Sequence, residues 1–260
     1  MRVNKKWLVI FALAAAIPLS GCGFITKLRA RDKLNKGVEA FAKQKYDEAA
    51  KLFEDSVALD PDFETAKIYL ATSYTSQFVP GSPDPKSTEM ADKAIKIFEN
   101  IVETNPKNIS AMLSIASLYY QLDNSAESKK WCGKIQAVDP SNAESLYRVA
   151  VIDYNDSSKK TGIQGENVEF LTAEDKEKTL SDIQEGLDCI DKALKIRPDY
   201  FDAMDYENLL WREKAMFEKD PKARAELIRN ADLISQKALQ MQLKAAEEEA
   251  KKPKKMAVGK

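Results

Sequence analysis

One stretch of the chain, residues 37–61, limits the possible folds more than any other. Its small and apolar residues Gly37, Phe41, Tyr46, Ala49 and Phe53 recur at steps of three and four, apart from one longer step across a break at Gln44-Lys45, and Pro61 follows eight residues later. Such spacing indicates two amphipathic helices with a short turn between them. We expect Gly37 and Ala49 to face each other, because helix axes about 8–10 Å apart leave no room for a long side chain. Pro61 ends the second helix, so the stretch predicts a helix–turn–helix pair.

Prolines spaced along the chain indicate that this unit is repeated. They are Pro61, Pro106, Pro140 and Pro198. Their separations of 45, 34 and 58 residues equal one 34-residue unit plus 11, one unit, and one unit plus 24. Segments that interrupt the pattern locate the extra length near residues 76–87, which are rich in proline, and 155–179, which are polar. We expect both insertions to lie between two helices of a repeat, with Thr172 capping a helix start inside the second.

The pattern resembles the tetratricopeptide repeat (TPR), a 34-residue helix–turn–helix unit with small, aromatic, Tyr, Ala and Pro residues at set positions. Ser56 replaces the second Ala of that pattern. The resemblance covers residues 30–243 and implies an all-α fold, a right-handed superhelix of about five such repeats. Stacked pairs would share a continuous core and leave a concave side open to a partner. Residues 244–260 are predicted to form a charged tail.

The first 22 residues have the pattern of a bacterial lipoprotein leader. A basic start precedes an apolar run over residues 7–19, which is too short to cross a hydrocarbon core of about 30 Å. The run closes on Leu19-Ser20-Gly21-Cys22, which resembles the lipoprotein box. The resemblance implies a signal peptide over residues 1–21, lipidation of Cys22 and a linker over residues 22–29. The alternative is an ordinary secretory signal with a chance cysteine.

Composition excludes several classes of function. The formal net charge of -1 provides no basic face for nucleic acid, whose binding requires neutralised phosphates. The chain has no His, so the commonest general base and zinc ligand are missing. Its three cysteines have no metal-binding spacing. We therefore expect no catalytic residues, no metal and no cofactor, and we expect Cys132 and Cys189 to be buried thiols rather than a disulfide.

The resemblance also implies a set of partner-binding residues, because TPR grooves are lined by outward positions of each first helix. The matching residues are Thr72, Ser117, Tyr120, Gln121, Tyr147 and Tyr154. Tyrosine offers a large contact area and one hydrogen bond, which suits a peptide or helix as ligand. The alternative for each residue is packing against a neighbouring repeat. Family members that clamp a C-terminal carboxylate use Lys, Asn and Arg where this chain has Leu34 and Val38, so that ligand is disfavoured.

These observations predict a non-catalytic protein-binding scaffold of the bacterial envelope. The protein would be lipid-anchored, on the periplasmic side of the outer membrane, because no Asp follows Cys22 to retain it at the inner membrane. The alternative is an envelope transport or assembly factor that binds a small or oligomeric ligand under the inserted loops. An open surface with exposed tyrosines favours the scaffold, whereas a closed pocket under the loops favours the transport factor.

Overall fold

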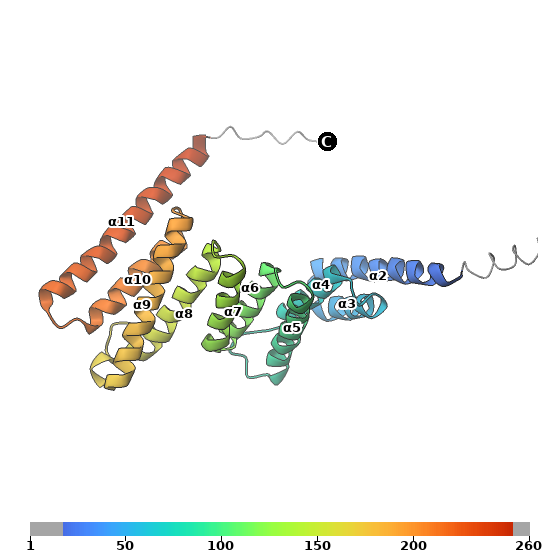
Figure 1. Ribbon diagram of the computed structural model, residues 1–260, viewed down its shortest axis with the longest axis horizontal. Coiled ribbons are helices and arrows are strands. Elements are labelled where there is room, and N and C mark those ends of the chain that lie inside the picture. Colours follow the sequence, from blue (N-terminus) through green and yellow to red (C-terminus); the bar gives the residue numbers. More distant parts are fainter. Residues whose placement is uncertain (1–17, 252–260) are drawn as a thin grey trace, which may run out of the picture. The chain divides into compact units, whose positions relative to one another are not determined.

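The computed structural model describes residues 18–251, within which every regular element is a helix (Figure 1). Side chains are described from Gly23 to Glu248. Residues 1–17 of the predicted signal peptide, the side chain of Cys22 and residues 252–260 of the predicted tail lie outside this description. The chain divides into two units, with the boundary between Leu122 and Asp123. The boundary falls between Pro106 and Pro140, the pair of prolines that are one 34-residue unit apart.

The first unit consists of antiparallel helices that follow one another along the chain. They are α2 (Pro18–Ala42), α3 (Tyr46–Leu59), α4 (Glu64–Thr75), α5 (Pro85–Thr104) and α6 (Ile109–Gln121). Each helix packs against the next, and α2 also touches α4. This arrangement confirms the predicted helix–turn–helix organisation of the unit.

The turn between α2 and α3 falls at the predicted break. Gln44 adopts a left-handed backbone conformation with φ 59°, which ends α2 and reverses the chain. The side chain nearest to Gly37 is that of Phe53 rather than that of Ala49. The aromatic ring of Phe53 covers Gly37 so closely that a Cβ built on the glycine would lie 2.4 Å from the ring. Glycine is therefore required here by the ring of Phe53, and Ala49 is fully buried on the same helix as that ring.

The first predicted insertion is shorter as a loop than the sequence indicated. Only residues 76–84 lie outside α-helix, because Pro85 occupies the first turn of α5, where its missing N–H costs nothing. The Asp84 side chain caps this helix by accepting from the N–H of Lys86 at 3.0 Å. Ser87 holds the loop through two hydrogen bonds with the backbone of Val79, at 2.8 and 3.0 Å.

The second unit has longer helices that pack in the same sequential way. They are α7 (Ser125–Val138), α8 (Ala143–Thr161), α9 (Ala173–Ile196), α10 (Phe201–Phe217) and α11 (Pro221–Lys251), with a short 3₁₀ helix, η1 (Val168–Phe170). In Figure 1, α11 runs beside α10, and the other helices of this unit pack in chain order. Helices α8 and α10 also touch. Residues of α8, α9 and α10 form one buried apolar core that includes Leu146, Ile183 and Leu210.

The second predicted insertion, residues 155–179, is mostly helical. Helix α8 continues to Thr161 and α9 begins at Ala173, so residues 162–172 form the connection. Two glycines with positive φ, Gly162 at 81° and Gly165 at 76°, make its turns. Thr172 caps α9 as predicted, since its hydroxyl accepts from the N–H of Asp175 at 3.0 Å.

The last helix extends into the predicted charged tail. Helix α11 continues to Lys251, and its side chains from Gln242 to Glu248 are all exposed. Within residues 18–251, no helix combines the length and the apolar character needed to cross a bilayer.

Candidate functional site

The predicted partner-binding residues of the first unit lie on the solvent-accessible sides of α4 and α6. Thr72 is half-buried, and its hydroxyl donates to the carbonyl of Ile68 at 2.7 Å. Ser117 and Tyr120 are half-buried and Gln121 is exposed. The Gln121 amide donates to the hydroxyl of Ser117 at 3.1 Å, so these two side chains lie together on one face of α6. This face of α6 presents polar and aromatic groups to solvent.

Tyr147 and Tyr154, the predicted partner-binding residues of the second unit, are partly used in packing. Both rings contact Tyr206 of α10 edge-on, with ring centroids 5.5 and 5.7 Å apart respectively. Tyr147 also contacts Tyr200, at 4.9 Å. Aromatic pairs of this kind add about 0.5–1.5 kcal/mol each beyond the area they bury. The two tyrosines therefore help to join α8 to α10, and only their remaining surface is open to a partner.

Burial raises the pKa of two of these tyrosine hydroxyls, those of Tyr147 and Tyr200. Burial raises the pKa of Tyr147 to about 12, and the neighbouring Tyr206 and Asp202 add to the effect. The hydroxyl of Tyr200 donates to Glu144 at 2.7 Å, and burial together with this hydrogen bond raises its pKa. Both of these hydroxyls are neutral donors at physiological pH.

The sequence did not reveal a row of buried polar residues inside the second unit, which we call the polar seam. It consists of Asp153, Ser157, Thr161, Thr179 and Glu213, each at most 2% exposed. The first three follow at steps of four on α8 and so share one face of that helix. Thr179 comes from α9 and Glu213 from α10. The sequence contained one indication of the seam. Asp153 lies four residues after the buried Val149, on the same face of the helix, where the periodicity predicts an apolar side chain.

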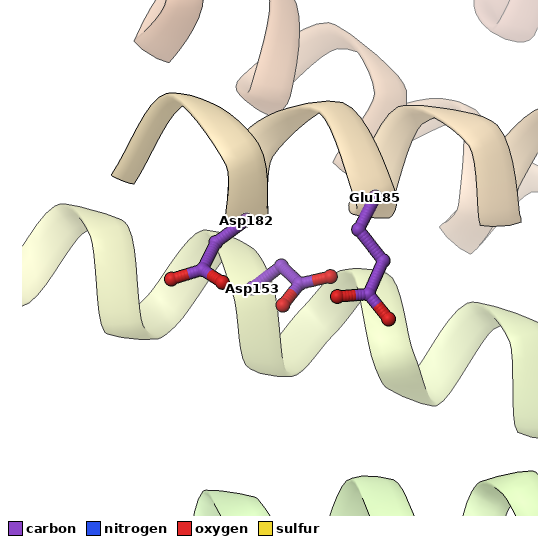
Figure 2. A group of neighbouring side chains, drawn as sticks. All are labelled: Asp153, Asp182 and Glu185. Carbon is purple, nitrogen blue, oxygen red and sulfur yellow. The ribbon is translucent and has the colours of Figure 1, made fainter. Parts of the chain in front are cut away.

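At one end of the seam, Lys129 of α7 joins α8 to α9. Its Nζ lies 2.5 Å from an oxygen of Asp153 and 2.8 Å from an oxygen of Glu185. Asp182 adds a third carboxylate beside them (Figure 2). Burial raises the pKa of Asp153 to about 7 despite Lys129, and the charges of Glu185 and Asp182 contribute. Burial alone lowers the pKa of Lys129, but its hydrogen bonds to Asp153 and Glu185 outweigh this and raise it.

The three carboxylates have the chemistry of a hard-cation site. Their oxygens lie within 4.8 Å of one another, and Figure 2 shows Asp153 of α8 between Asp182 and Glu185 of α9. Oxygen ligands of this kind suit Ca²⁺ or Mg²⁺. However, the ammonium of Lys129 already contacts two of the three groups, so a divalent ion would have to displace a half-buried positive charge. We therefore interpret the arrangement as an ion-pair network that reaches from the buried Asp153 to the exposed Glu185.

Along the seam as a whole, only some of the buried polar atoms have hydrogen-bond partners. The hydroxyl of Thr161 donates to Glu213, while burial raises the pKa of that carboxyl. The hydroxyls of Ser157 and Thr179 and one oxygen of Asp153 have no hydrogen-bond partner within the described part of the protein. Unpaired buried polar atoms cost about 1–3 kcal/mol each, so the seam lowers the stability of this unit.

Among the cavities of the described part of the protein, two shallow ones lie outside the seam. One, of about 270 Å³, lies between α9, α10 and α11 and is lined by residues that include Asp191, Glu207 and Lys237. The other, of about 240 Å³, lies at the turn between α2 and α3, beside Lys36, Lys43 and other residues. Neither of these two cavities is lined by a residue of the connecting loops 76–84 or 162–172. These cavities therefore do not support a pocket under the inserted loops.

The two cysteines of the second unit are free thiols, and one of them is buried as expected from the sequence. Cys132 of α7 is buried and Cys189 of α9 is half-buried. Burial raises the pKa of each thiol to about 11. Both therefore remain protonated and unreactive at neutral pH.

No protein-family model and no curated protein matches this sequence. Solved structures do. A crystal structure of MamA protein is similar with a TM-score of 0.59 and 14% identity, over 84% of this chain and 94% of that one. MamA 41-end from Desulfovibrio magneticus RS-1 is similar with a TM-score of 0.54 and 10% identity, over 80% of this chain and 96% of that one.

A further solved structure is YrrB, described as a TPR protein with an unusual peptide-binding site. Its TM-score is 0.49 and its identity 13%, over 83% of this chain and 90% of that one. At such identities the likeness to MamA concerns the fold alone. Together with the sequential helix pairs, it confirms the predicted fold class, which is all-α and of the TPR type.

Proposed function

We propose that this protein is a membrane-anchored scaffold of the bacterial envelope that binds a protein partner through the first helices of its repeats. The observation that carries the proposal is that α4 and α6 each present hydroxyl, amide or aromatic groups on a solvent-accessible face. Such groups combine contact area with hydrogen bonding at low entropic cost. The proposal includes no catalytic step and no cofactor.

The partner-binding surface of the first unit is centred on α6. Ser117 and Gln121 are hydrogen-bonded to each other and face solvent, and Tyr120 lies beside them in the sequence of the same helix. Thr72 on α4 is half-buried, and its hydroxyl donates to the carbonyl of Ile68. Ile68 is itself 38% exposed and adds apolar area. A partner helix or extended segment with apolar anchors and a few hydrogen-bonding groups fits this chemistry.

In the second unit we propose the exposed parts of Tyr147 and Tyr154 as contacts. Their rings are fixed by Tyr206 and therefore lose little conformational freedom on binding. Preorganisation of this kind favours affinity, because less entropy is lost when the partner arrives. Crosslinking in living cells followed by mass spectrometry should capture an envelope protein through residues 64–154. Recovery of lipid alone from these residues would contradict the scaffold.

We propose lipidation at Cys22 as the anchor. The support comes from the sequence, in which an apolar run of signal-peptide length closes on Leu19-Ser20-Gly21-Cys22. Two or more acyl chains hold a protein stably on a bilayer, whereas one gives only marginal binding. Cys22→Ser should abolish labelling by a clickable palmitate and leave an unprocessed or soluble protein. Labelling that persists in this variant would exclude Cys22 as the anchor.

We propose the periplasmic face of the outer membrane as the location. The support is the absence of Asp after Cys22, where Gly23 stands. Tethering at a membrane raises the effective concentration of a binder for partners in the same membrane. Density-gradient separation of the two membranes should recover the protein with the outer one, and recovery with the inner membrane would contradict this location while leaving the anchor intact.

A further inference from the structure

The first turns of α2 expose an apolar stripe made of Phe24, Ile25 and Leu28. Their side chains are 66%, 50% and 49% exposed, respectively. Single exposed apolar residues are ordinary, but adjacent large ones on a single face mark a surface that another apolar phase covers. We therefore expect another apolar surface to cover the stripe.

Helix geometry shows that α3 cannot be this occupant. Helix α2 packs against α3 through a face that includes Ala30, Leu34 and Gly37, all buried. At about 100° per residue, the centre of this packing face lies about half a turn from the centre of the apolar stripe. The stripe thus points away from the core of its own unit.

Basic residues border the stripe on both sides. Lys27 and Arg29 are exposed and lie about a quarter turn to either side of the stripe's centre, at about 100° per residue. Arg31, also exposed, continues the basic character one turn further along. From Gly23 onward, the first acidic residue is Asp32. This segment therefore carries three positive charges around an apolar face.

We propose that this face of α2 lies on an anionic lipid bilayer, with the stripe inserted at the boundary between headgroups and acyl chains. An apolar face flanked by Lys and Arg is the pattern of a helix that lies in the plane of the interface. Each cation contributes to attraction toward anionic headgroups. The proposal rests on the proposed function in one respect, the acylated Cys22. Phe24 follows Cys22 by two residues, a rise of about 3 Å along the helix, so the acyl chains would bring the stripe to the membrane.

A second exposed apolar site in the chain provides a matched control. Phe170 at the end of η1 is 84% exposed, more than Phe24. Its neighbours in sequence are acidic, among them Glu166, Glu169 and Glu174, and all three are exposed. An anionic surface repels such a site. If exposure of an apolar side chain were enough for membrane contact, both phenylalanines would contact the membrane. If basic neighbours are also needed, only Phe24 would.

The test places a tryptophan at each site in the lipidated protein as a bacterial host produces it. Phe24→Trp and Phe170→Trp are reconstituted into phosphatidylcholine vesicles with or without phosphatidylglycerol, and the spectrum of the unsubstituted protein is subtracted. Lipids brominated on the acyl chain should quench the added fluorescence of Phe24→Trp by more than half and leave that of Phe170→Trp unchanged. Because both sites are exposed, neither substitution disturbs the fold. Equal quenching at the two sites, or none at residue 24, overturns the proposal, including the case in which a protein covers the stripe.

The cations supply a second readout. In the Phe24→Trp background, replacing Lys27, Arg29 and Arg31 with Gln should lower quenching on vesicles that contain phosphatidylglycerol and leave it unchanged on pure phosphatidylcholine. Each cation near an anionic surface contributes about fivefold to binding. Unchanged quenching on the anionic vesicles would contradict the proposed attraction between these three cations and the anionic headgroups. Palmitate labelling distinguishes the two proposals. Labelled protein without quenching would contradict only the insertion of the stripe into the bilayer, and quenching without labelling would contradict only the acylation of Cys22.

Discussion

The interiors of the two units are held together by different chemistry on similar helix pairs. In the first unit, the ring of Phe53 lies against Gly37, and the buried hydroxyl of Ser56 donates to the carbonyl of Ala30 at 2.7 Å. In the second, two carboxyls and three hydroxyls lie in the polar seam, and Lys129 closes one end of it. Both interiors have an apolar core, but the second adds buried carboxyls and a lysine that the first lacks within the described residues.

The difference teaches how a repeat stack fixes which helices are neighbours. Apolar packing against a glycine fixes the spacing of two helices. Lys129 of α7 contacts both α8 and α9, and so fixes the relative positions of three helices. Buried ion pairs add little net stability, because desolvation offsets the Coulomb attraction. We infer that the seam serves the register of α7, α8 and α9 more than the stability of the unit.

Removing the ammonium from the second interior should have the largest effect. Lys129→Met leaves Asp153 buried beside two other carboxylates without a positive charge, and we expect unfolding free energy to fall by about 2–4 kcal/mol. Chemical denaturation measures it. Lys130→Met is the matched control, since Lys130 is exposed and forms an ion pair with Glu127 one turn earlier on the same helix. If the two variants were equally stable, the ion-pair network would have no role in holding the unit.

Filling the first interior should have the next largest effect. In Gly37→Ala the new methyl group would lie 2.4 Å from the ring of Phe53, which must shift, at a cost of about 1–3 kcal/mol. The control is Gly133→Ala on α7, where nothing lies within 4 Å of the added Cβ. It should gain about 0.5–1 kcal/mol, because glycine is a poor helix former. A loss in both variants would show that the contact with Phe53 is not the cause.

The polar interior should also respond to pH. The folded-state pKa of Asp153, about 7, lies above its ordinary value of 3.8, so the folded protein binds a proton that the unfolded chain releases. Its contribution to stability is complete below about pH 4, declines by up to about 1.4 kcal/mol per pH unit as pH rises toward 7, and is then constant. Comparing the pH dependence of unfolding in the parent and in Asp153→Asn isolates this term. Identical slopes in the two proteins would contradict the raised pKa.

The smallest change is expected at Glu213. Burial raises the pKa of this carboxyl, and Glu213→Gln has the shape of the neutral acid and retains an acceptor for the hydroxyl of Thr161. We expect a difference within about 1 kcal/mol, whereas Glu213→Ala should lose more, because Thr161 is then left without its partner. A large loss in Glu213→Gln would show that a charged Glu213 is needed.

The helix pairs could be predicted from the sequence because their signals are local. The turn at Gln44, the end of α3 before Pro61 and the cap at Thr172 all depend on residues within one or two turns. The second insertion was overestimated for a related reason. Residues 155–161 are polar and were interpreted as a loop, but Ser157 and Thr161 are buried in the seam and the segment is helical.

The candidate sites depended on contacts that no local pattern contains. Lys129 meets Asp153 from 24 residues away and Glu185 from 56. Tyr147 and Tyr154 were predicted to contact a partner, with packing against a neighbouring repeat as the alternative, and both pack on Tyr206, more than 50 residues further along the chain. Which polar residue enters the interior, and which tyrosine stays open, is decided by the neighbouring helix rather than by the residue's own segment.

Binding of a protein partner to the first-helix surface can be tested with a matched pair of photocrosslinkers. One is placed at Gln121 on α6 and the other at Lys96 on α5; both positions are exposed and belong to the first unit. After irradiation of living cells, we predict a discrete adduct with one envelope protein from position 121 and none from position 96. The same adduct from both positions, or from neither, would contradict the claim.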